Sequence, residues 1–311
     1  MRIIKINEQQ YHSLLLNEEL HYPKFLDKLK DYVSTRVHIK IEEELKNKNY
    51  SFQFLLPCDC EYTDNIWFDI NIDPNGDITN KKLYNCFYYN QYNNLFNGKL
   101  INPRIIINCP CKNTGVTFLL LKTALSHELT HLYDDWNELS RSKNGINFVQ
   151  QNQDTTKLVN TYITQKNEDL LKSISFLSYM SLKVEKQAFL SQTIQELEEI
   201  GCTLYNYKEK LKQTIIYNNI NKSYKTIVSK INSTDDEELL NFNKYIIDIV
   251  PKANIPKLNV GEFNAEKYRN MLLQWAEKTH HHMMKYYGSV VQYYLDRLQE
   301  EKNKITSMYI L

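Results

Sequence analysis

The pattern of apolar and polar positions changes twice along the chain. Residues 24–48 have the pattern of a helix over most of their length. Residues 51–110 instead contain short runs that are rich in aromatic and β-branched residues and separated by turn signals, which is typical of strands. One signal, DPNGD at 73–77, contains Asn-Gly and favours a tight hairpin. The runs SFQFLLPC, NIWFDINI, KLYNCFYYN and RIIINC therefore predict a small, mostly antiparallel sheet.

Helical patterns occupy most of the chain after the sheet. The predicted helices cover about 116–139, 168–200, 203–231, 235–249 and 264–305. One helix, a small sheet and then helices only is the element order of an α+β fold. We expect the sheet to pack on the helix at 116–139, with a large helical region after it. We place the division between an N-terminal α+β part, residues 1–165, and a helical part, residues 166–311.

The first helix after the sheet contains the segment ALSHELTHLYDDW, residues 124–136. Residues four apart lie on one face of a helix, so its apolar residues form one continuous stripe. The members of that stripe are Phe118, Leu121, Leu125, Leu129, Leu132 and Trp136. His127 and His131 lie on a second stripe that continues to Asp135, and Glu128 lies at the border between the two. The pattern therefore predicts one buried face and one face that carries chemistry.

The spacing of the two histidines suits a metal ion. Imidazoles one turn apart can converge on a single tetrahedral zinc, and Glu128, offset by one position, can reach a zinc-bound water as general base. Zinc lowers the pKa of such a water toward ~7, so a carboxylate can deprotonate it near neutral pH. Asp135 could accept a hydrogen bond from a ligand histidine. The alternative is a chance occurrence of the pattern on an exposed polar helix.

The sequence HELTH with Asp135 four residues later resembles the active helix of the zincin metallopeptidases, in particular the gluzincin branch that includes thermolysin-like enzymes. The metzincin branch needs Gly and a third His, and Asp134 and Asn137 stand at those positions. The resemblance covers about 50 residues, namely this helix and the segment of the third ligand. It implies a zinc-dependent peptidase in which the third ligand is a downstream glutamate.

The third zinc ligand is expected to be a carboxylate, because no further histidine lies nearby. Glu185, in LSYMSLKVEKQAFLSQ, is followed three residues later by Ala188, which resembles the gluzincin pattern for this ligand. Small neighbours on its helix would allow a close approach to the histidine helix: Ser178, Ser181 and Ala188. The competing carboxylates are Glu138, Glu168 and Glu196. Glu185 is the predicted ligand, and an ordinary solvated charge is the alternative.

Two further groups of residues invite a functional interpretation. Cys58 and Cys60 form one CxC pair, and Cys109 and Cys111 form another, so four thiolates would meet if their strands were neighbours. Simple structural thiols are favoured, because this spacing is unusual for metal sites. The segment THHHMMKYYG supplies candidates that would stabilise an oxyanion, a role that gluzincins give to a downstream His or Tyr: His280, His281, His282, Tyr286 and Tyr287. Ordinary helix residues are the favoured interpretation for this group.

Composition limits the remaining classes. A net charge of +1 gives no electrostatic reason to expect nucleic acid or an anionic membrane as partner. No stretch has the roughly 18 apolar residues of a membrane span, and the N-terminus lacks the apolar segment of a secretory signal. The opening MRIIKINEQQ resembles the leaders of many phage-encoded proteins, but a strand followed by a surface helix is the favoured interpretation. We expect a cytoplasmic protein, or one packaged in a virion.

These observations predict a zinc metallopeptidase, an endopeptidase, with one zinc ion per chain and a peptide or protein substrate. The first alternative is a structural or assembly protein, for instance of a phage particle, that is built on a zincin scaffold. The second is a metallopeptidase toxin or effector. The sequence leaves the cleavage specificity and the oligomeric state open.

Overall fold

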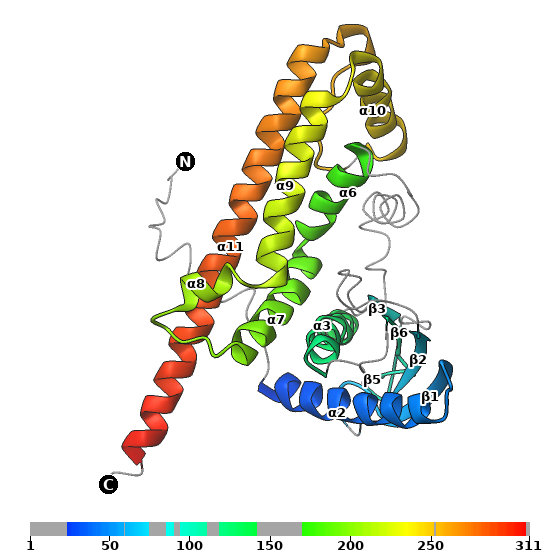
Figure 1. Cartoon of the computed structure of the whole chain (residues 1–311), viewed down its shortest axis with the longest axis vertical. Coiled ribbons are helices and arrows are strands. Elements are labelled where there is room, and N and C mark those ends of the chain that lie inside the picture. Colours follow the sequence, from blue (N-terminus) through cyan, green and yellow to red (C-terminus); the bar gives the residue numbers. More distant parts are fainter. Residues whose placement is uncertain are drawn as a thin grey trace.

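The computed structural model describes residues 24–58, 60–74, 85–89, 94–110, 118–141, 170–251 and 253–308 (Figure 1). The leader at 1–23, most of the DPNGD turn, Cys111 and Glu168 lie outside these ranges. Figure 1 shows α2, α3 and the sheet gathered together, and the long helices α9 and α11 running side by side. The predicted α+β fold is confirmed, with a sheet that packs against helices and a mainly helical region after it.

The main sheet has four strands in the order β1-β2-β6-β3, namely β1 (Ser51–Pro57), β2 (Asn65–Asp73), β6 (Arg104–Pro110) and β3 (Asn85–Tyr89). The pairs β1–β2 and β3–β6 are antiparallel, whereas the central pair β2–β6 is parallel. Two short strands, β4 (Leu95–Phe96) and β5 (Lys99–Leu100), form a separate antiparallel pair. The sheet is therefore mixed, and mostly antiparallel by its pairings.

The hairpin that Asn-Gly favours between β2 and β3 is not the pairing of these strands, because β6 lies between them. The central parallel pair explains this arrangement. β6 runs in the same direction as β2 and offers it a nearly continuous apolar partner, with Ile105 and Ile107 fully buried. Pairing with β6 therefore buries more apolar surface than a hairpin with the polar, aromatic β3 would.

One face of the sheet is covered by α2 (Lys24–Lys46) and α3 (Phe118–Arg141). Alternate residues of β2 point toward these helices and are buried: Ile66, Phe68, Ile70 and Ile72. On the helix side of this interface, the predicted apolar stripe of α3 contributes four fully buried residues, Leu121, Leu125, Leu129 and Leu132. The stripe reaches the surface only at its ends, with Phe118 and Trp136 partly exposed.

The helical region begins with α6 (Leu170–Met180) and α7 (Lys183–Glu199), followed by α8 (Tyr207–Leu211), α9 (Ile215–Ser233), α10 (Asp236–Ile249), the short 3-10 helix η2 (Val260–Glu262) and α11 (Ala265–Met308). Its apolar side chains form a second buried cluster that extends from Leu170 to Val291. Within the part of the chain that the structure describes, no helix is long and apolar enough to span a membrane.

Two of the expected helices are interrupted. The helix expected at 168–200 breaks between α6 and α7, because Leu182 adopts an extended conformation with φ −64° and ψ 147°. The helix expected at 203–231 breaks before α9, where Thr214 has the same kind of backbone and its hydroxyl accepts a hydrogen bond from the Tyr217 amide. A helical pattern of apolar residues on either side of such a break does not reveal it.

Candidate metal centre

Two helices that are far apart in the sequence bring three potential metal ligands to one point. His127 and His131 lie one turn apart on α3, and Glu185 lies in the first turn of α7, which packs along α3. The nearest nitrogen and oxygen atoms of the three side chains all lie within 4.8 Å of one another. This is the convergence that the sequence predicted for Glu185.

The separations of the ligand atoms fit a tetrahedral ion. The two Nε2 atoms are 3.1 Å apart, and Oε2 of Glu185 lies 3.5 Å from Nε2 of His127 and 3.6 Å from Nε2 of His131. Ligands about 2.0–2.2 Å from a zinc ion at tetrahedral angles stand roughly 3.3–3.6 Å apart. The same Oε2 is buried and has no hydrogen-bond donor among the described residues. Two imidazoles and a carboxylate with this geometry can hold a divalent metal ion.

The charges of the three groups are strongly coupled. Burial of the His131 imidazole would lower its pKa, but the Glu185 carboxylate, with smaller contributions from Glu128 and Asp134, raises that pKa to about 9. Burial of Glu185 would raise its pKa, but the imidazoles of His131 and His127 outweigh it and hold the pKa well below its usual range. Without a metal, the site therefore keeps a proton on an imidazole as a substitute cation.

This coupling predicts how metal affinity depends on pH. A metal ion binds neutral imidazole, so below about pH 9 it must displace the proton from His131, whereas Glu185 stays ionised and releases none. We expect zinc affinity to fall about tenfold for each unit of pH between roughly 8 and 6. Competitive titration against a chelator of known proton affinity, repeated across this range, measures the slope. An affinity that does not change with pH would contradict the assignment of His131 as a ligand.

Glu128 is buried beside the ligands, and strand β3 holds it in place. Its Oε2 accepts a hydrogen bond of 2.7 Å from the Tyr88 backbone amide. Burial raises the pKa of Glu128, and the two imidazoles and the Tyr88 amide oppose that effect only in part. A carboxyl group with a raised pKa next to a metal site can take up and return a proton near neutral pH.

Tyr88 also contacts Asp135, the residue that was expected to orient a ligand histidine. The Tyr88 hydroxyl donates a hydrogen bond of 2.8 Å to Oδ2 of Asp135. Tyr88 thus contacts two positions of α3, with its amide at Glu128 and its hydroxyl at Asp135. The sequence carried no signal for this role, because the edge position of β3 beside α3 follows from the strand order.

The structure places the competing carboxylate Glu196 away from the imidazoles. Its Oε2 accepts a hydrogen bond of 2.6 Å from the Ile215 amide, so it connects α7 to the start of α9. Burial raises the pKa of Glu196 to about 7. Glu168 and the side chain of Glu138 lie outside the described part of the structure.

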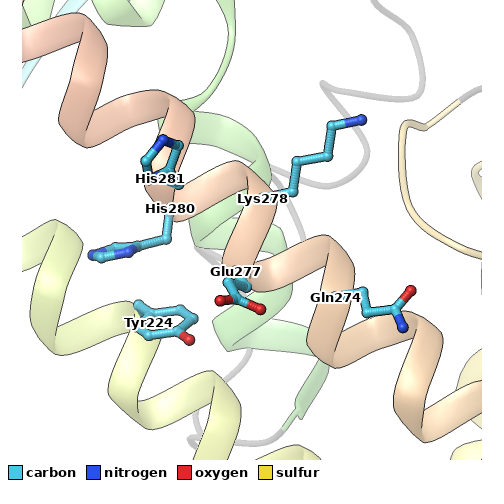
Figure 2. A pocket seen from close by; sticks show the side chains of 6 residues that line it. All are labelled: Tyr224, Gln274, Glu277, Lys278, His280 and His281. Carbon is cyan, nitrogen blue, oxygen red and sulfur yellow. The ribbon is translucent and has the colours of Figure 1, made fainter.

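The residues of the THHHMMKYYG segment point in different directions. His280 stacks on Tyr224 of α9 with ring centroids 4.3 Å apart, and its Nε2 lies 3.0 Å from Oδ1 of Asn221. Figure 2 shows His280 beside Tyr224 and close to His281, in a surface pocket between α9 and α11. His281 and His282 are exposed.

The two tyrosines of this segment lie nearer to α7. The Tyr286 ring is 4.8 Å from the Lys186 ammonium. The Tyr287 hydroxyl is buried and has no hydrogen-bond partner among the described residues. Burial raises the pKa of Tyr287, and the neighbouring Tyr286 and the charge of Glu185 add to that effect. Tyr287 is therefore close enough to the candidate metal centre for the charge of the Glu185 carboxylate to contribute to its raised pKa.

Cys58 and Cys60 lie at the opposite end of the sheet from Cys109, so these three thiols do not meet at one site, and Cys111 lies outside the described residues. Cys58 follows Pro57, which pairs with Asn65, whereas Cys109 pairs with Ile72. Seven residues along β2 separate these positions by roughly 23 Å. The Cys60 thiol instead donates to the Thr63 carbonyl at 3.2 Å. The antiparallel direction of β1 relative to β2 is the reason for the separation.

Comparisons of the chain with protein-family models, with curated proteins and with solved structures found no match.

Proposed function

We propose that the protein is a zinc-dependent peptidase with a gluzincin-like site, in which His127, His131 and Glu185 hold one zinc ion. The observation that carries this proposal is the convergence of the three ligand atoms with the buried carboxylate of Glu128 beside them. A catalytic zinc has three protein ligands and an open position. The described residues supply three potential ligands. The side chain of His131 is 17% exposed, more than those of the other two, so the open position can face solvent on its side.

The chemical roles follow from position and charge. A bound zinc ion would supply a Lewis acid and a water of lowered pKa. Glu128 accepts the proton of the attacking water and passes it to the leaving amine, a role that suits its raised pKa. The Tyr287 hydroxyl, buried and without a partner in the described structure, donates a hydrogen bond to the oxyanion of the tetrahedral intermediate.

An extended peptide is the substrate that the surroundings favour. β3 is at the edge of the sheet, and among the described strands only β6 pairs with it. The Tyr88 amide points away from β6 and donates to Glu128, so the free edge of β3 faces the proposed site. An extended chain can add to such an edge through its own backbone hydrogen bonds, which would present a peptide bond to Glu128.

The direct test is hydrolysis by the purified protein after it has been loaded with zinc. We expect new peptide termini, detected by mass spectrometry, when it is incubated with unfolded proteins and a peptide library. Removal of the metal with 1,10-phenanthroline should abolish cleavage, and added zinc should restore it. Stoichiometric zinc without any cleavage would favour the structural or assembly alternative, and failure to bind zinc would contradict both the peptidase and a zinc scaffold.

A further inference from the structure

A chain of buried hydrogen bonds connects α2 to both helices that carry the metal ligands. The Lys30 ammonium donates to Oγ of Ser191 at 2.6 Å, and the Ser191 hydroxyl donates to the Ser126 carbonyl at 3.2 Å. The two serine Oγ atoms are 3.4 Å apart. Lys30, Ser191 and Ser126 are 2%, 1% and 0% exposed. The chain of bonds therefore lies inside the protein, where α2, α3 and α7 meet.

The two serines lie on the two helices that carry the proposed metal ligands. Ser126 immediately precedes His127 on α3, and Ser191 lies on α7, the helix of Glu185. The Ser126 carbonyl also accepts a hydrogen bond of 2.8 Å from the hydroxyl of Thr130, the residue before His131. Hydrogen bonds from Ser191 of α7 and from Thr130, which precedes His131, thus meet at the Ser126 carbonyl of α3.

Keeping a lysine at this place costs free energy. Burial lowers the pKa of Lys30, although Glu198 and Asp31 partly compensate. A buried amine or ammonium group is tolerated when its hydrogen bonds are satisfied. It then favours the packing arrangement that keeps those hydrogen bonds over arrangements in which the helices are shifted. A shift of α7 along α3 would take the Ser191 hydroxyl away from the Lys30 ammonium and from the Ser126 carbonyl together.

A restraint on the position of α7 matters because a metal site tolerates only small errors in the positions of its ligands. Moving along a helix by one residue is a 1.5 Å step with a rotation of about 100°. Ligand distances must be correct to within about 0.2 Å. Apolar contacts between α3 and α7 are not directional, so they restrain a small slide less than a set of hydrogen bonds does.

We propose that Lys30, through Ser191 and the Ser126 carbonyl, sets the register of α7 on α3 that brings Glu185 to the two imidazoles. Lys30 and Ser191 are positioning residues, since neither contacts the metal or the substrate. The inference rests on the proposed metal site and adds the part of the fold that holds it in shape.

The test compares Lys30→Met and Ser191→Ala with the unmodified protein, using Zn²⁺ and Co²⁺ as probes. Lys30→Met replaces a costly buried cation by an apolar side chain of similar length, so the thermal midpoint should stay the same or rise. Ser191→Ala leaves the buried Lys30 with fewer partners, so the midpoint should fall. Both variants should nevertheless bind zinc roughly tenfold or more weakly, the size of effect that groups behind metal ligands have. Both should also shift the visible absorption spectrum of the Co²⁺ form, which reports the coordination geometry.

The matched control is Ser34→Ala, one turn further along α2. Ser34 is fully buried, but its hydroxyl has no hydrogen-bond partner among the described residues, so zinc affinity and the Co²⁺ spectrum should not change. Zinc affinities that follow the thermal midpoints, or that equal the parent value in both variants, would overturn the positioning role and leave the metal site intact. An unmodified protein that binds no zinc would overturn the metal site and this inference together.

Discussion

Glu128→Gln is expected to retain zinc and to lose nearly all hydrolytic activity. The amide of glutamine can still accept the hydrogen bond from the Tyr88 amide and fills the same buried space, so the ligands should stay in place. It cannot take a proton from water, however, and general-base catalysis contributes about 10²–10⁴-fold. The rate constant for cleavage of a peptide identified as a substrate should fall by that factor.

The comparison needs equal metal loading of parent and variant, confirmed by elemental analysis. Glu277→Gln is a suitable control, because Glu277 is an exposed glutamate of α11 in the surface pocket beside Tyr224. The control should cleave the peptide at the parent rate. Turnover by Glu128→Gln equal to that of the parent would exclude the general-base role.

Glu185→Ala should lose zinc while the fold persists. The substitution removes one of three ligands and the negative charge that raises the pKa of His131. The loss of a ligand should exceed the 10–100-fold cost that is typical of changes behind the ligands, so we expect more than about 100-fold weaker binding. Chelator competition gives the affinity, and elemental analysis shows whether the purified variant still carries metal.

Glu196→Gln provides the matched control on the same helix. Its amide oxygen can keep the bond to the Ile215 amide, and the residue is not part of the ligand group. Zinc affinity should therefore equal that of the parent. Full zinc affinity of Glu185→Ala would exclude Glu185 as a ligand, and another carboxylate would then have to be the third ligand. His127→Ala, which removes an imidazole from α3, should lose metal to at least the same extent.

The local elements of the fold could be predicted from the sequence, because the periods of helices and strands depend on neighbouring residues. The runs SFQFLLPC, NIWFDINI, KLYNCFYYN and RIIINC became β1, β2, β3 and β6, and the apolar stripe of α3 became its buried face. The proximity of His127 and His131 was predictable for the same reason, since residues i and i+4 face the same way on any α-helix. Their spacing points to metal chemistry before any tertiary contact is known.

The tertiary structure decided everything that depends on which distant segments meet. It brought Glu185 rather than Glu196 to the two imidazoles, placed β6 between β2 and β3, and separated Cys58 and Cys60 from Cys109. It also brought Tyr88 to Glu128 and Asp135. These outcomes depend on the packing free energy of many side chains at once, whereas local periodicity depends on a few neighbours. The sequence therefore determined that the two imidazoles of α3 lie together, and the packing of α7 and β3 against α3 determined which other groups lie beside them.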